Sequence, residues 1–96
     1  MGQSTRRAPA RELLEAAHEF PGSYLIKAFG PATDVFRSGI EEAGRSAVGA
    51  RLELSERLSS KGNSICITLT LAAETVDEVL LAYDRLHDVP GLKMIL

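Results

Sequence analysis

The sequence predicts a small α+β domain with a ferredoxin-like βαββαβ order. We expect a two-layer sandwich in which a four-stranded antiparallel sheet, of strand order 4-1-3-2, carries both helices on one face. A short helix is expected to precede it. Three observations predict this fold: two alternating segments flank a hairpin-type turn, two segments have helical periodicity, and the length of 96 residues is enough for one domain.

The leading helix and the first strand are separated by a turn. Leu13, Leu14 and Ala17 recur at helical spacing among charged residues, which predicts a helix over residues 10–19. Pro21-Gly22 ends it, because proline cannot continue a helix and glycine opens a turn. The following run, Ser23–Phe29, is rich in aromatic and branched residues, so it is predicted to be a strand.

The first long helix is predicted over residues 32–48. Its apolar residues follow helical spacing: Phe36, Ile40, Ala43 and Ala47. Thr33 or Asp34 can cap its start. Gly39 and Gly44 each weaken the helix by about 1 kcal/mol relative to alanine, so the helix must depend on packing.

The second and third strands are predicted to form a hairpin. Leu52 and Leu54, with Leu58 further on, alternate with polar residues, which indicates a half-exposed strand. Ser59–Asn63 is the turn, in which Gly62 or Asn63 is free to take positive φ. The third strand has the clearest pattern of the chain. Its two sides are Ile65, Ile67, Leu69 and Leu71, and Cys66, Thr68, Thr70 and Ala72.

The second long helix begins at a predicted capping box. Thr75 and Glu78 stand three residues apart, directly before an apolar run at helical spacing. Pro90-Gly91 ends this helix, and Leu92–Leu96 is predicted to be the last short strand.

Composition limits the classes of function. The chain is 45% hydrophobic and 25% charged, as in soluble globular domains, with a formal charge of −2 that gives no reason to expect nucleic acid or an acidic membrane as a partner. A single cysteine, Cys66, excludes an internal disulfide and favours a reducing, cytoplasmic setting. No apolar run approaches the roughly 20 residues of a membrane span. We expect a disordered N-terminus over residues 1–9 and one domain over residues 10–96.

Short segments from Leu13 to the end of the chain occur in a characteristic order. They are Leu13-Leu14, Phe20-Pro21, Ile26-Lys27, Gly30, Ser59-Ser60-Lys61-Gly62-Asn63, Tyr83, Leu86 and Leu92-Lys93-Met94-Ile95-Leu96. Their order and spacing resemble the YbeD-like family of small bacterial proteins of unknown function. The chain departs from the family at Ser64, where an aromatic residue is usual, and in extra residues around Glu15–Glu19. The resemblance implies a ferredoxin-like fold similar to the ACT-type modules that bind small metabolites, and it implies no reaction.

Known activities of ferredoxin-like domains each require residues that this chain lacks. An acylphosphatase needs an arginine in the loop after the first strand, and Gly30–Thr33 contains none. A metallochaperone needs paired cysteines there. An RNA-binding sheet needs aromatic residues on its central strands, where the third strand offers none. His18 and His87 are expected to be solvated or structural. We therefore expect no enzyme, no cofactor and no metal.

Two features are candidate binding sites. Alternation places Leu25, Lys27 and Phe29 on one side of the first strand, and we expect Lys93 and Ile95 beside them on an open sheet face. Monomers rarely leave such an apolar patch bare, so a second copy, a partner or the leading helix is expected to cover it. The alternative is that these are scattered apolar residues of an ordinary protein surface. The second feature is the turn. Its residues, Ser59, Ser60, Lys61, Gly62 and Asn63, either hold an anion through backbone N–H groups or form a plain solvated hairpin loop.

The sequence thus predicts a non-catalytic interaction or regulatory module. It would act as a homodimer or against a protein partner through the open sheet face. The alternative is an ACT-like sensor of a small metabolite with a carboxylate, bound near Lys27, Lys61 or an interface. Neither hypothesis involves nucleic acid or a membrane.

Overall fold

The computed structural model describes residues 8–96, so most of the N-terminus predicted to be disordered, residues 1–7, lies outside the described residues. The elements follow in the order α1 (Arg11–Ala17), β1 (Gly22–Pro31), α2 (Asp34–Val48), the 3-10 turn η1 (Gly49–Arg51), β2 (Leu52–Leu58), β3 (Ser64–Ala73), α3 (Val76–His87) and β4 (Met94–Ile95). The class is α+β, with three α-helices and a four-stranded sheet in the described part of the chain.

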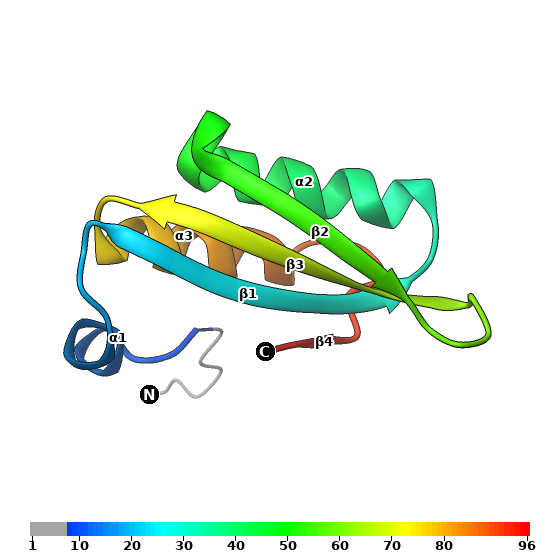
Figure 1. The fold of residues 1–96 in the computed structure, drawn as a ribbon, viewed down its shortest axis with the longest axis horizontal. Coiled ribbons are helices and arrows are strands. Elements are labelled where there is room, and N and C mark those ends of the chain that lie inside the picture. Colours follow the sequence, from blue (N-terminus) through cyan, green and yellow to red (C-terminus); the bar gives the residue numbers. More distant parts are fainter. Residues whose placement is uncertain (1–7) are drawn as a thin grey trace.

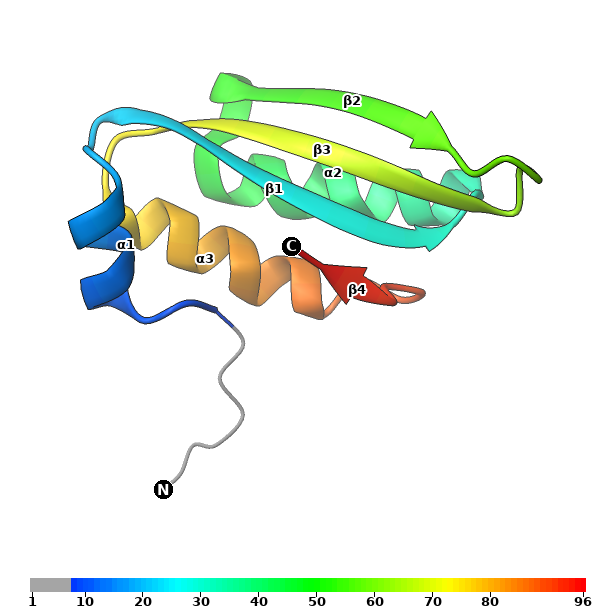
Figure 2. The same ribbon diagram turned by 60° about the horizontal axis from the view of Figure 1, so that its bottom comes forward.

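The sheet is antiparallel throughout and open at both edges. Its hydrogen-bonded order is β2-β3-β1-β4, which is 4-1-3-2 when counted from the opposite edge. The two long strands at the centre pair from Gly22 with Ala73 to Pro31 with Ser64. The two long helices, α2 and α3, lie on one face of this sheet (Figures 1 and 2).

The core lies between the sheet and these two helices. The predicted inner side of β3 is buried throughout, and the predicted inner side of β1 is buried with it. The buried apolar strand residues are Tyr24, Ile26, Ala28, Leu52, Ile65, Ile67, Leu69, Leu71 and Ala73. They pack against Phe36 and Ile40 of α2 and against Val79 and Leu86 of α3. Each buried aliphatic side chain contributes about 1.5–3 kcal/mol, so this layer is the main stabilising feature of the fold.

Two glycines allow close approach between α2 and the sheet. A Cβ on Gly30 would lie 2.4 Å from Cζ of Phe36, and a Cβ on Gly44 would lie 2.9 Å from Cδ2 of Leu52 and of Leu69. Both distances are below any real contact. Gly44 lowers the intrinsic stability of α2, but it allows the helix to pack closely against the sheet, and this packing offsets the loss.

Both long helices begin at the positions predicted from the sequence, but the capping of α3 differs from the prediction. Thr33 is the N-cap of α2, where its Oγ1 accepts a 3.1 Å hydrogen bond from the Phe36 N–H. Thr75 is the N-cap of α3, but its side chain makes no capping bond, so the predicted capping box is wrong. The Glu78 carboxylate accepts from the Glu74 N–H instead (2.8 Å), because the two-pronged Arg51 side chain holds it there.

The first and last elements are shorter than predicted. Helix α1 spans seven residues and β4 spans two. The pairing of β4 with β1 extends one residue to each side, since Lys93 N–H donates to the Phe29 carbonyl (2.8 Å) and Leu96 N–H donates to the Lys27 carbonyl (2.8 Å). Over residues 8–96, none of the helices has the length and apolar character of a membrane span.

Candidate functional site

The sheet face opposite α2 and α3, here called the open face, is uncovered by the described residues. Figure 1 shows the four strands in front of both long helices. Strand register places its side chains in three rows across β2, β3 and β1: Glu53, Thr70 and Leu25; then Ser55, Thr68 and Lys27; then Arg57, Cys66 and Phe29. Leu25 is 56% exposed and Phe29 is half-buried, as the alternation of the first strand predicted.

The contribution of β4 to the open face differs from the prediction. Ile95 pairs with Ala28, whose side chain lies in the core, so Ile95 belongs to the helix-covered side and is half-buried there. Lys93 precedes β4, and its N–H donates to the carbonyl of Phe29, which is also the register partner of Met94. Met94, 49% exposed beside Phe29, and Leu96, 64% exposed beside Lys27, lie on the open face. The prediction for Ile95 was wrong by one residue of register, which exchanges the two faces of a strand.

Helix α1 does not cover the open face. It lies against α3 next to the start of β1, at the stretch of that edge which β4 does not reach (Figures 1 and 2). Leu14 is buried in the core and Phe20 packs against it, whereas Leu13 is exposed. Of the three covers expected for the open face, the leading helix is therefore excluded.

The open face is divided into an apolar half and a polar half. The apolar half comprises the side chains of Leu25, Phe29, Met94 and Leu96 on β1 and β4. The polar half lies on β2 and β3 and includes a hollow of about 330 Å³, here called the basic hollow. Its lining side chains on the open face are Lys27, Ser55, Arg57, Cys66 and Thr68.

The two cations of the basic hollow come from strands on either side of β3. Lys27 of β1 and Arg57 of β2 are both exposed, and neither has an ion-pair partner among residues 8–96. Glu56 also borders the hollow, but its carboxylate lies on the other side of β2, where it accepts a 3.1 Å hydrogen bond from Nε of Arg37. Sequence reasoning singled out Lys27 but missed Arg57 and Ser55. The sequence did contain a signal for them: Ser55 and Arg57 alternate with Leu52 and Leu54 along β2, which places them on the opposite side of the strand.

A second, apolar hollow adjoins the basic hollow. It has a volume of about 210 Å³ and shares Arg57 and Cys66 with its neighbour. Phe29 supplies apolar lining from the open face, and Ser59 and Ser64 also line the hollow. Leu58 and Ile65 border it from the helix-covered side of their strands, where Ile65 is buried. The two hollows thus place positive charge next to the Phe29 ring.

The predicted anion site at the hairpin turn is separate from Lys27. Gly62 has the expected positive φ of 76°. However, its N–H donates to the Ser59 carbonyl (2.9 Å), and Ser59 Oγ accepts from the Ser64 N–H (3.2 Å). The Gly62 N–H and the Ser59 hydroxyl, both expected to bind an anion, thus form hydrogen bonds within the turn instead. All five turn residues are exposed. The structure therefore supports the reading of Ser59, Ser60, Lys61, Gly62 and Asn63 as a solvated hairpin loop.

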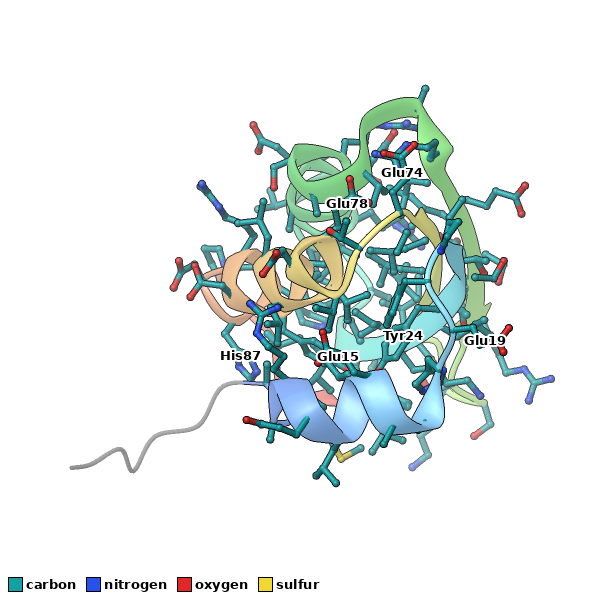
Figure 3. The ribbon with its side chains drawn as sticks, turned by 90° about the vertical axis from the view of Figure 1, so that its left-hand side faces the viewer. Glu15, Glu19, Tyr24, Glu74, Glu78 and His87 are labelled. Atoms are coloured by element: carbon teal, nitrogen blue, oxygen red, sulfur yellow. The ribbon has the colours of Figure 1, made fainter. Side chains whose placement is uncertain are left out.

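A buried tyrosine pair lies at the opposite end of the core. The hydroxyls of Tyr24 and Tyr83 are 2.9 Å apart, and the His18 ring packs edge-on against Tyr24 at 4.7 Å between centroids. Burial raises the pKa of Tyr83 above its ordinary value, and the hydrogen bond with Tyr24 adds to this effect. In Figure 3, which faces this end of the molecule, Tyr24 lies above α1. The sequence indicated each tyrosine as inward-facing, but not their contact.

Within residues 8–96, no hydrogen bond joins the side chain of either histidine to a serine, threonine or cysteine. His18 is exposed beside Tyr24, and His87 is in the last turn of α3. Figure 3 shows His87 on the opposite side of this view from Glu19. Among residues 8–96, no three histidine, cysteine or acidic side chains come close enough together to hold a metal ion.

These features define a class: a small α+β domain whose antiparallel sheet is covered by helices on one face and left uncovered on the other by residues 8–96 (Figure 2). A family model described as "Protein of unknown function (DUF493)" matches residues 15–96, which is most of the chain. The chain belongs to this family, the YbeD-like family of small proteins of unknown function. The search of curated proteins found no match.

Proposed function

We propose that this chain is a non-catalytic interaction module that binds a second copy of itself through the open face. The observation that carries the proposal is the bare apolar half, in which Leu25, Met94 and Leu96 are each about half exposed or more. Contiguous apolar surface of this kind on a soluble domain is typical of a protein interface. The ferredoxin-like arrangement accommodates such an interface without disturbing the helix layer.

The rows of the open face favour a second copy as the occupant. In a twofold dimer each patch meets its own image, so residue i contacts residue j and j contacts i. A twofold axis running across the strands along the Ser55 and Lys27 row would place Glu53 against Arg57 of the second copy. The same axis would place Leu25 against Phe29 of the second copy. On the axis itself Lys27 would face Lys27 of the second copy, so the face is complementary in its outer rows, where Glu53 meets Arg57 and Leu25 meets Phe29, and carries two like charges at the centre.

This arrangement resembles the packing of two sheets in a β-sandwich. Facing sheets pack about 10 Å apart with their side chains interdigitated. A standard interface needs about 800 Å² from each partner, which is a modest part of the 5781 Å² surface of this chain.

The test is the solution mass of the wild type and of Phe29→Asp by light scattering over a concentration series. We expect the wild type to approach twice the 10.4 kDa of one chain, and the variant to be monomeric. Val35→Asp is the matched control, because Val35 is 74% exposed in the first turn of α2, away from the open face, and should leave the dimer intact. A wild type that stays monomeric throughout the series would contradict the proposal.

A second candidate function is that of a sensor for a small metabolite with a carboxylate. The basic hollow favours it, because Lys27 and Arg57 lie beside hydroxyl groups and lack ion-pair partners in the described part of the chain. A ligand that binds only the folded state would raise the melting temperature by mass action.

A further inference from the structure

The basic hollow has the composition of an anion site. Four other arginines in residues 8–96, namely Arg11, Arg37, Arg45 and Arg51, each pair with a carboxylate. Lys27 and Arg57 do not, although both border one hollow. Two like charges facing the same space repel each other, and an anion between them removes that repulsion.

Neutral hydrogen-bond donors complete the hollow. Thr68 of β3 is half-buried and pairs in register with Ser55 of β2 on one side and with Lys27 of β1 on the other. Hydroxyl groups between two cations can donate to the same anion, and hydrogen bonds to a charged acceptor are stronger than neutral ones. Glu53 is the neighbouring acidic residue on this face, and it lies one row away from the hollow.

The apolar hollow indicates that the ligand has an apolar part in addition to its anionic group. It adjoins the basic hollow at Arg57 and Cys66, and Phe29 supplies its apolar side chain on the open face. A purely inorganic anion would leave this surface uncovered. A molecule with an anionic head and an apolar body would fill both hollows and gain from the burial of apolar area.

We propose that the two hollows bind a small organic anion, with its carboxylate or phosphate between Lys27 and Arg57 and its apolar body against Phe29. This inference deepens the second candidate function, and it does not depend on dimerisation. It does predict competition with the second copy, because Arg57 would be needed both by the anion and by Glu53 of the second copy.

The test is a titration of the full chain followed by amide chemical shifts, with phenyl phosphate, benzoate, inorganic phosphate and neutral benzyl alcohol as probes. We expect saturable shifts at Lys27, Arg57 and Thr68 with phenyl phosphate or benzoate. The relative affinities of these two probes identify the preferred head group. Inorganic phosphate should bind about tenfold more weakly, since it lacks the apolar body, and benzyl alcohol should not bind measurably.

Substitutions locate the site. Lys27→Gln and Arg57→Gln are each expected to weaken binding about tenfold or more. Lys61→Gln is the matched control, because Lys61 is an exposed lysine on the hairpin turn, away from the hollow. An equal loss in Lys61→Gln, equal binding of benzyl alcohol, or no saturable shift with either organic anion would overturn the inference.

The solution mass measured in the same samples separates the two proposals. Anion binding by a monomeric wild type would support the inference and contradict dimerisation through the open face. A dimer that binds neither organic anion would support the proposed dimer and overturn the inference. If both hold, phenyl phosphate should shift the dimer towards monomer, whereas sodium chloride at equal ionic strength should shift it less.

Discussion

The hydroxyls of Tyr24 and Tyr83 form a side-chain hydrogen bond inside the core of the domain. Both rings are buried, so each hydroxyl depends on the other for a partner. We expect Tyr83→Phe to lower the free energy of unfolding by about 1 kcal/mol, because it leaves the Tyr24 hydroxyl without its partner. Urea denaturation of both single variants and of the double variant measures this. The double variant should lose less than the sum of the two, and additive losses would contradict the coupling.

Tyr83 should also make the stability of the protein depend on pH under alkaline conditions. Burial raises the pKa of Tyr83 in the folded state above the ordinary value of 10.0, so the unfolded chain releases its proton first. Stability from this group is therefore complete below pH 10 and is lost as pH rises above that value, by up to about 1.4 kcal/mol per pH unit. Tyr83→Phe should show a shallower decline than the wild type in the same experiment. Parallel declines would show that Tyr83 ionises as easily in the folded protein as in the unfolded one.

At the scale of elements, α1 depends on its contacts with the rest of the fold. Seven residues are too few for a stable isolated helix in water. Leu14 is inserted in the core, and Arg11 forms an ion pair with Asp77 of α3. The helix is thus a docked element, and its side chains at the core decide whether it forms.

Two adjacent leucines provide a matched pair for testing α1. Leu14→Ala should lower the free energy of unfolding by about 2–3 kcal/mol, because it removes a buried side chain and leaves a cavity. Leu13→Ala should change it by less than about 0.5 kcal/mol, since Leu13 is 66% exposed. Urea denaturation measures both, and amide exchange over residues 11–17 should accelerate only in Leu14→Ala. Equal effects of the two variants would contradict the docking of α1 through Leu14.

Helix α2 shows the opposite relation between local preference and packing. Alanine is about 1 kcal/mol better than glycine inside a helix, yet a Cβ at Gly44 would lie 2.9 Å from two leucine methyl groups. We expect Gly44→Ala to destabilise the domain by about 1–2 kcal/mol, since overpacking outweighs the gain in helix propensity. Ser38→Ala, at an exposed position of the same helix, should be neutral or slightly stabilising. The melting temperatures of the two variants measure both effects. A higher melting temperature for Gly44→Ala than for the wild type would show that α2 can move away from the sheet.

At the scale of the whole molecule, the proposed dimer rests on charge complementarity between rows. Glu53→Arg alone or Arg57→Glu alone should weaken the dimer about tenfold, or about 1.4 kcal/mol, because each reversal places like charges together at two symmetric contacts. The double variant Glu53→Arg/Arg57→Glu should recover most of the wild-type association. Sedimentation at several concentrations measures all three. A double variant weaker than either single variant would contradict the twofold arrangement.

The open face also shows which strand faces can be predicted from the alternation of apolar and polar residues. Strand β3 alternates apolar and polar residues, so the sequence indicated Ile65 to Leu71 as its buried side. Strand β1 has apolar residues on both sides, and its sequence grouped Leu25, Lys27 and Phe29 on one surface without fixing which surface is buried. The last strand has apolar residues at almost every position, so its pattern does not distinguish one face from the other. Its register had to come from the hydrogen bonds with β1, which place Met94 and Leu96 outward and Ile95 inward.

The sequence by itself determined the class of fold, the order of its elements, the inner side of β3, and the family to which the chain belongs. These follow from local periodicity and from turn residues, which act over a few positions. Only the tertiary structure decided that α1 leaves the open face bare, that Tyr24 meets Tyr83, and that Arg57 joins Lys27 at one hollow. Each of these joins residues far apart in the chain. Such contacts depend on strand register and helix docking, which are set by the packing of the whole core rather than by any local segment.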